Sequence, residues 1–187
     1  MLVPILLVFA EFLLVIATAA LVVWIWMVGQ HFSVPYVVTR RQVIKSTLDA
    51  LQLEDAEVFY DLGSGDGRII IAALKRFPHL RGIGVEARSG FVFLSRLAAR
   101  WQGIESRADF HTGDIFQTNL SKATRVYAFL SHPMMAKLES KFDKELKGAR
   151  LVSLGFPLPN RKPNEIIEVE TSSKHYRKIY VYDYPAL

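Results

Sequence analysis

The residues that most clearly indicate chemistry lie at 61–67, where an aspartate is followed by three glycines at alternate positions. Residues 58–60 before them are apolar and β-forming, and a helical run begins at Arg68. Glycine tolerates the positive φ of a sharp reversal and has no side chain to hold a ligand off the backbone. The stretch therefore predicts a strand, a ligand-binding turn and a helix. The residues expected to bind at this turn are Asp61, Gly63, Ser64, Gly65 and Gly67.

Two further carboxylates are expected beside this turn. Glu86 ends the next apolar strand pattern, 23 residues after Gly63, and Asp114 follows the third. Because the carboxyl ends of parallel strands meet at one edge of a sheet, these acids and Asp61 should converge there. Glu86 is placed to bind the two hydroxyls of a ribose. In nucleotide-binding folds, an acid about twenty residues after the glycine turn has this role. Asp114 is placed to accept a hydrogen bond from an adenine amino group, with Ile115 packing on the ring.

Two classes of ligand fit such a turn, and the acids within it discriminate between them. A dinucleotide brings a pyrophosphate, which the charges of Asp61 and Asp66 would repel. S-adenosylmethionine has no phosphate and brings a cationic ammonium and sulfonium instead. The spacing is G-x-G-x-G, whereas the dinucleotide fingerprint is G-x-G-x-x-G. The turn thus favours S-adenosylmethionine, and a purely structural strand-to-helix turn is the alternative.

The elements that must position these residues alternate between strand and helix along the chain. This alternation predicts an α/β fold, a Rossmann-like parallel sheet with helices on both faces. The last two strands, 165–170 and 178–184, have only a short polar loop between them, so they should form a terminal antiparallel hairpin. The other elements are expected at 42–53, 68–77, 90–102 and 134–146 for helices and at 58–61, 82–86, 108–111, 125–130 and 149–154 for strands.

The first thirty residues form a segment of different character, since Glu11 is the only ionisable side chain from 2 to 28. These 27 residues would make a helix of roughly 40 Å, against about 30 Å for a hydrocarbon core. We therefore expect residues 1–30 to form a transmembrane anchor and 31–187 a folded domain, with a cleaved signal peptide as the alternative. Glu11 is then either an acid tolerated near the outer headgroups or a polar contact with another membrane protein.

The charges that flank the apolar segment predict its orientation and the localisation. Arg40, Arg41 and Lys45 follow it and nothing basic precedes it, so the positive-inside rule predicts a single-pass membrane protein. Its carboxyl-terminal domain would lie on the cytoplasmic side, or on the matrix side in a mitochondrion. The partner predicted on this basis is the lipid bilayer.

Composition limits the other partners. Residues 31–187 carry all 23 basic residues and 17 of the 18 acids, so their formal charge is +6. Charge alone does not choose between anionic lipid, an acidic partner and nucleic acid, although we expect no nucleic acid. The chain has no cysteine, which excludes disulfides and thiolate metal sites. The five histidines show no metal-ligand spacing, so no metal is expected.

The motifs together resemble a known family. The stretch 61–68 with Glu86 and Gly113–Asp114 is similar to the class I S-adenosylmethionine-dependent methyltransferases. Residues 35–39, 150–153 and 156–159 resemble the small protein-lysine methyltransferases of archaea. They also resemble the membrane-anchored relatives that methylate the c-subunit of mitochondrial ATP synthase and the adenine nucleotide translocase. The resemblance implies cofactor roles for Asp61, Gly63, Gly65, Gly67, Glu86 and Asp114, and places Tyr36, Thr39 and residues 129–132 near the active site.

Several positions depart from the pattern of these relatives. Val38 and His132 stand where proline is common, and Phe129 stands where several relatives have tyrosine. Leu154–Gly155 replaces a frequent polar pair. These departures concern the methyl acceptor and leave the cofactor unaffected.

The reaction implied is N-methylation of a lysine in a membrane-associated protein. A lysine amine has a reference pKa near 10.4 and must lose a proton, which an apolar, aromatic-lined channel favours. Candidates for this channel are Tyr36, Phe129, Ser131 and Phe156, each with ordinary packing or capping as the alternative role. Methylation of a lipid headgroup or a lipophilic small molecule, and a non-catalytic membrane scaffold that binds a nucleoside, remain as alternatives.

Overall fold

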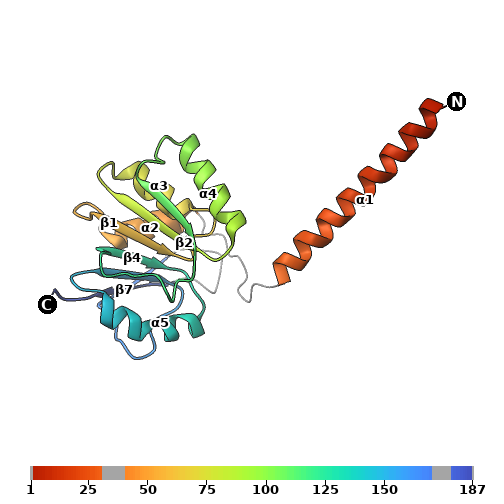
Figure 1. The fold of residues 1–187 in the computed structure, drawn as a ribbon. Helices are drawn as coiled ribbons and strands as arrows, with labels where there is room; N and C mark the ends of the chain where they lie inside the picture. The colour runs from red at the N-terminus through yellow and green to blue at the C-terminus, as the bar shows by residue number, and fades with distance from the viewer. Residues whose placement is uncertain (1, 31–40, 170–177, 187) are drawn as a thin grey trace. The chain divides into compact units, whose positions relative to one another are not determined.

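The computed structural model describes residues 2–30, 41–169 and 178–186 of the chain. Two units can be distinguished, residues 1–37 and residues 38–187, and each is described by itself. In its described part the first unit is a single helix, α1 (Leu2–Gln30) (Figure 1). The predicted domain boundary after residue 30 coincides with the end of α1, and the domain assignment itself stays a prediction.

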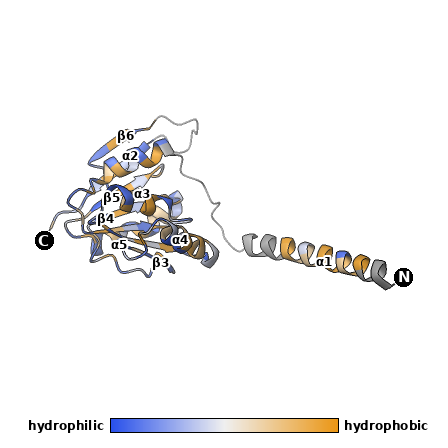
Figure 2. Cartoon of the chain, turned by 90° about the horizontal axis from the view of Figure 1, so that it is seen from above, coloured by the Kyte–Doolittle hydropathy of each residue, from blue (hydrophilic) through white to orange (hydrophobic). Residues whose placement is uncertain are grey.

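Helix α1 is apolar on all sides. Its side chains are described from Leu7 to Val23, and every one of them is exposed. Figure 2 shows the helix largely in the colours of apolar residues. The Thr18 hydroxyl lies 2.9 Å from the carbonyl oxygen of Leu14 and 2.8 Å from that of Val15, so it is satisfied within the helix.

The membrane prediction needs correction. Among the described residues, no helix has both the length and the apolar character that crossing a membrane requires. The predicted transmembrane helix over 1–30 is therefore not supported. The predicted localisation, a single-pass membrane protein with a cytoplasmic or matrix-facing domain, is wrong on this finding.

The second unit is built on a seven-stranded sheet with the order β3-β2-β1-β4-β5-β7-β6. Neighbours from β3 to β5 run parallel, whereas β7 is antiparallel to both β5 and β6. The parallel Rossmann-like sheet and its terminal antiparallel pair are therefore confirmed. The strands are β1 (Val58–Leu62), β2 (Arg81–Glu86), β3 (Ala108–Thr112), β4 (Arg125–Ala128), β5 (Arg150–Leu154), β6 (Glu165–Glu168) and β7 (Lys178–Asp183).

The strand order has its topological switch point beside β1. The chain proceeds outward from β1 to β2 and β3, and then returns to place β4 on the other side of β1. In this register Asp61 of β1 lies between Gly84 of β2 and Tyr127 of β4. Ligands in open α/β sheets bind at such a switch point, outside the carboxyl ends of the strands.

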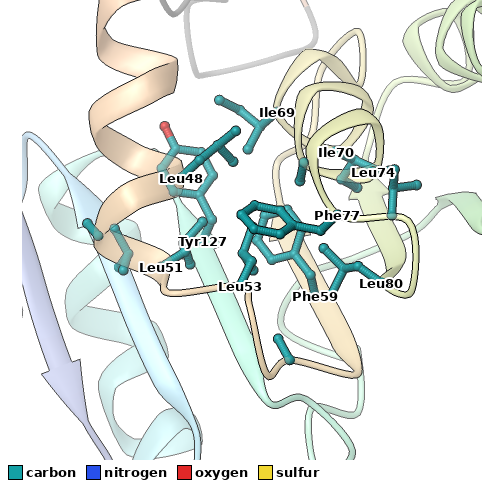
Figure 3. Packing of buried hydrophobic residues seen from close by; sticks show 14 of the residues in the cluster. Leu48, Leu51, Leu53, Phe59, Ile69, Ile70, Leu74, Phe77, Leu80 and Tyr127 are labelled. Atoms are coloured by element: carbon teal, nitrogen blue, oxygen red, sulfur yellow. The ribbon is translucent and has the colours of Figure 1, made fainter.

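Helices cover both faces of the sheet (Figure 1). One face is packed against α2, α3 and α4 around Phe59 and Phe110, and Figure 3 shows part of this cluster. The other face is covered mainly by α5, which buries Leu138 and Phe142 in a second cluster. The helices are α2 (Arg41–Leu51), α3 (Arg68–Arg76), α4 (Ser89–Trp101) and α5 (His132–Glu145).

Local sequence explains where these helices lie. In α2 the residues Val43, Thr47, Leu48 and Leu51 recur at helical spacing and are buried, as the pattern predicts. Pro133 lies in the first turn of α5, where its missing N–H has no partner to lose. Each observed boundary of α2 to α5 lies within about two residues of its prediction, which is normal because helix ends fray.

The last strand anchors the second core cluster. Tyr182 and Tyr184 alternate on β7 and its continuation, and both are buried on the α5 face. The Tyr182 hydroxyl accepts a hydrogen bond from the Leu158 N–H at 2.8 Å. The tyrosine alternation therefore reflects packing of one face of the strand.

Candidate cofactor and acceptor site

The glycine turn joins β1 to α3 in a backbone conformation that requires glycine. Gly63, Gly65 and Gly67 have φ values of +80°, +54° and +75°. A Cβ added at Gly67 would lie 2.7 Å from the ring of Phe110. The turn is fixed to β2, since the N–H groups of Gly63 and Ser64 both donate to the Val85 carbonyl at 2.8 and 3.1 Å. The turn is thus fixed in a conformation that requires glycine, with Gly63 exposed and Gly65 and Gly67 buried.

Glu86 is held at the end of β2 by two backbone groups. Its Oε2 accepts from the Gly65 N–H at 3.0 Å, and its Oε1 accepts from the Arg88 N–H at 3.0 Å. Each carboxylate oxygen has a further lone pair, so this arrangement orients the group and leaves acceptor capacity for hydroxyls. The geometry fits the ribose role predicted for Glu86.

Asp61 is the most strongly perturbed acid at this edge of the sheet. It is 2% exposed, and its burial, together with the charges of Glu86 and Asp66, raises its pKa to about 8. A cation beside Asp61 would favour its ionised form and relieve this cost. Asp61 therefore fits the positive charge of S-adenosylmethionine and disfavours a pyrophosphate.

Asp66 is less available than the sequence suggests. Its carboxylate forms an ion pair with the Arg68 guanidinium, with Nε at 2.8 Å from Oδ1 and 3.1 Å from Oδ2. The Arg68 guanidinium therefore compensates much of the charge of Asp66. The cationic preference of the turn rests on Asp61 and Glu86.

The predicted adenine-binding residues follow β3. The Gly113 N–H donates to the Glu86 carbonyl at 3.0 Å, which places this segment beside the end of β2. Asp114 is exposed, and its Oδ1 accepts from the Phe116 N–H at 2.8 Å. Ile115 is 7% exposed and packs in the second core cluster. The cofactor roles of Asp114 and Ile115 stay predictions, and most of the Ile115 surface is used for packing.

Ser64 lies under the turn. Its side chain is 7% exposed, and a Cβ added at Gly84 would come within 2.8 Å of its Oγ. Within the described part of the chain this hydroxyl has no hydrogen-bond partner. Its predicted contact with the cofactor is untested.

The predicted acceptor residues are divided between the described and undescribed parts of the chain. Phe129 and Ser131 follow β4, and Phe156 follows β5, so all three lie at the same edge of the sheet as Asp61. Ser131 is the N-cap of α5 and forms no side-chain cap bond, which leaves its hydroxyl for other partners. Tyr36, predicted for the acceptor channel, and Thr39, predicted to bind the cofactor, lie outside the described residues.

Two positioning side chains gave no signal in the sequence. Ser95 of α4 is fully buried, and its hydroxyl lies 3.0 Å from the Gly65 carbonyl, so α4 supports the glycine turn. Glu139 of α5 is 6% exposed, and its carboxylate accepts from the Asn160 N–H at 2.9 Å and from Asn160 Nδ2 at 2.8 Å. A lone Ser or Glu on a helix is common, and only the tertiary contacts distinguish these two.

No metal site is evident in the residues that the structure describes, because no three His, Cys, Asp or Glu side chains are grouped to hold an ion. The predicted absence of a metal therefore stays a prediction.

Comparison with known proteins agrees with this geometry. Residues 61–165, more than half of the chain, match the ANTKMT methyltransferase domain. A protein-lysine N-methyltransferase of Saccharolobus islandicus is 35% identical over 150 residues, which cover 80% of this chain and 92% of that protein.

Vertebrate relatives are similar over a smaller share of their length. The lysine N-methyltransferase of the ATP synthase c-subunit from Xenopus laevis is 34% identical, over 73% of this chain and 60% of that protein. The adenine nucleotide translocase lysine N-methyltransferase of Mus musculus is 33% identical, over 82% of this chain and 64% of that protein.

A solved structure shows the same fold with a ligand. The crystal structure of an RNA methyltransferase from Salinibacter ruber, in complex with S-adenosyl-L-homocysteine, has a TM-score of 0.74 and 29% identity. The match covers 80% of this chain and 94% of that one. With the buried Asp61 and the Glu86-bound glycine turn, these similarities identify the chain as an S-adenosylmethionine-dependent methyltransferase that belongs to the family of the ANTKMT methyltransferase domain.

Proposed function

We propose that this methyltransferase acts on the ε-amino group of a lysine in a protein. The observation that carries the proposal is the similarity to the Saccharolobus protein-lysine N-methyltransferase, which extends over 92% of that protein. The names of the Xenopus and mouse relatives also specify lysine in a protein as the acceptor.

We assign the cofactor contacts to the turn and to the strand ends on either side of it. Asp61 binds the cationic end of S-adenosylmethionine, Glu86 binds its ribose, and the glycines of the turn allow the close approach. When bound, the cofactor would supply a methyl group on a sulfonium, and the methyl carbon would bond to the amine lone pair as the carbon–sulfur bond breaks and the sulfur leaves as a neutral thioether. The contribution of the protein is alignment and exclusion of water.

The acceptor side is assigned to the ends of β4 and β5. Phe129 and Phe156 are half-buried aromatic side chains there, and each packs on one of the two core clusters. Apolar walls disfavour a charged ammonium and so help the lysine to lose its proton. We propose that the Ser131 hydroxyl accepts the hydrogen bond of the neutral amine, and the roles predicted for Tyr36 and Thr39, which lie outside the described residues, stay predictions.

A labelling experiment tests the class of acceptor. The purified chain is incubated with methyl-labelled S-adenosylmethionine and an extract of its source organism, which is then separated into protein, lipid and RNA. We expect label in protein. Label in RNA would instead favour the activity named for the Salinibacter structure, and label in lipid would favour a headgroup.

The same extract tests the finer part of the prediction. We propose that the acceptor is a membrane-associated protein, as the resemblance to the methyltransferases of the ATP synthase c-subunit and of the translocase implies. Labelled protein should then sediment with the membranes. Label confined to the supernatant would contradict this part alone and leave the lysine assignment intact.

A further inference from the structure

The outward side of α4 carries apolar side chains where other helices of the same unit carry charge. Val92, Ser95 and Ala99 form its buried side. At about 100° per residue, the opposite side consists of Gly90 and the residues that we call the α4 apolar face. This face consists of Phe93, Leu94, Leu97 and Trp101.

The exposure of this face is high. Phe93 is 66% exposed, Leu94 is 51% and Trp101 is 79%, while Leu97 is half-buried between them. The outward sides of α2, α3 and α5 instead expose residues such as Lys45, Lys75 and Lys144. Single exposed apolar residues are ordinary, but a contiguous group rimmed by polar residues marks an interaction site.

The charges around the face restrict its partner. Three arginines, Arg88, Arg96 and Arg100, lie on α4 or directly before it. Residues 88–101 include no Asp or Glu. Arg96 is directed toward β3, where its Nε donates to the Phe110 carbonyl at 2.9 Å. If two copies of this chain packed through α4, their positively charged arginines would lie close together and repel one another. A partner with carboxylates beside its own apolar side is complementary.

The face is tied to the glycine turn. The Arg88 N–H donates to Glu86, and the Ser95 hydroxyl lies 3.0 Å from the Gly65 carbonyl, so α4 and the turn form one rigid arrangement. Phe93 to Trp101 spans about 12 Å along the helix. The α4 apolar face lies on the opposite side of the same helix from Ser95, so a protein bound there is separated from the cofactor turn by one helix diameter, roughly 10–12 Å.

We propose that the α4 apolar face docks the acceptor protein through an apolar α-helix that carries carboxylates along its flank. Phe93, Leu97 and Trp101 recur at i, i+4 and i+8, which makes a ridge that fits the groove of a second helix. The inference rests on the proposed function, because it takes the docked protein to be the methyl acceptor. It identifies the substrate as a protein whose reactive lysine is adjacent to such a helix.

Two lysine peptides test the proposal. One is an amphipathic helix with a leucine side, glutamates on its flank and a lysine near one end, and the other is an unstructured polar peptide with one lysine. Wild type is compared with the double variant Phe93→Ser/Trp101→Ser, which changes exposed side chains only. The control is Ile166→Ser, which removes an apolar side chain that is 51% exposed on β6.

We expect the double variant to raise KM for the helical peptide about tenfold, with kcat and the Kd for S-adenosylmethionine unchanged. Methylation of the polar peptide, and all rates of Ile166→Ser, should equal wild type. An unchanged KM for the helical peptide would overturn the proposal.

The remaining outcomes separate docking from catalysis and from other occupants. If wild type methylates neither peptide, the proposed function fails, and fluorescence anisotropy then measures docking directly. Binding of the helical peptide that the double variant loses supports the face, and equal binding by both forms, or none, overturns it. A change from dimer to monomer in the double variant, or loss of binding to phosphatidylserine vesicles without loss of peptide binding, would assign the face to another partner and overturn the proposal.

Discussion

At the scale of single residues, Asp61 is the side chain to which we assign the main part of cofactor recognition. Its folded-state pKa, about 8, lies above its ordinary value of 3.8, so folding takes up a proton between these pH values. The free energy of unfolding therefore falls as pH rises from about 4 to about 8. At neutral pH the protein without cofactor is therefore less stable than it would be at about pH 4. A cation bound beside Asp61 would stabilise the ionised carboxylate and offset this loss.

The substitution Asp61→Asn separates stability from binding. At pH 8 the variant should have a melting temperature equal to or above that of wild type, because a neutral amide replaces a buried carboxylate. Its affinity for S-adenosylmethionine should fall by about 2 kcal/mol or more, since a charged hydrogen-bond partner is lost. Thermal denaturation and calorimetric titration measure the two effects. An unchanged affinity would contradict the role given to Asp61.

The same pKa predicts how cofactor affinity depends on pH. Only the ionised form of Asp61 attracts a cation, so affinity should fall about tenfold for each pH unit below 8. Calorimetry from about pH 6 to about pH 9 measures the slope, which should flatten above pH 8. In Asp61→Asn the slope should vanish, and a wild-type affinity that is flat below pH 8 would contradict the account.

At the scale of elements, the glycine turn depends on close packing as well as on positive φ. Gly67→Ala would place a Cβ 2.7 Å from the Phe110 ring at a φ of +75°, so it should lower the free energy of unfolding by more than about 2 kcal/mol. Gly103 has a φ of +66° but open space around it, so Gly103→Ala should cost about 1 kcal/mol. Urea denaturation measures both variants. Equal losses would show that Phe110 does not constrain the turn.

The segment after β5 is a second element whose position should matter for the acceptor. Ser153 Oγ donates to the Phe156 carbonyl at 2.6 Å, and Glu139 binds Asn160. Glu139→Ala removes two hydrogen bonds from Asn160 to a charged acceptor, so it should lower stability by about 1–3 kcal/mol and reduce kcat on the acceptor. The Kd for S-adenosylmethionine should stay unchanged.

A matched control lies on the same helix, α5. Asp143 pairs with Arg161 at 2.8 Å, but both side chains are more than a third exposed. Asp143→Asn should therefore change stability by less than about 1 kcal/mol and leave kcat at the wild-type value. If the two variants behave alike in steady-state kinetics, Glu139 does not position the acceptor segment.

At the scale of the whole molecule, the periodicity of the sequence predicts the fold well. Parallel strands that are buried on both faces give continuous apolar runs in the sequence, and the alternating glycines mark the turn between β1 and α3. These elements can therefore be recognised from the local sequence, without knowledge of their tertiary contacts. Contacts across the fold are not encoded locally. The burial of Ile115 and the support of the turn by Ser95 therefore became visible only in the structure.

The amino-terminal segment shows the limit of composition as evidence. An apolar run predicts a helix, and α1 is one, but no helix among the described residues has both the length and the apolar character that crossing a membrane requires. The departures at Val38 and at Leu154–Gly155 concern the acceptor, whose identity depends on a partner molecule and not on the fold of this chain.

The most direct test of the central claim is the amino-acid analysis of protein labelled by the purified chain with methyl-labelled S-adenosylmethionine. Wild type should give methylated lysine after complete hydrolysis, and Asp61→Asn should give much less at the same limiting cofactor concentration. Label on another amino acid, or equal labelling by Asp61→Asn, would contradict the account of a lysine methyltransferase whose cofactor is bound by Asp61.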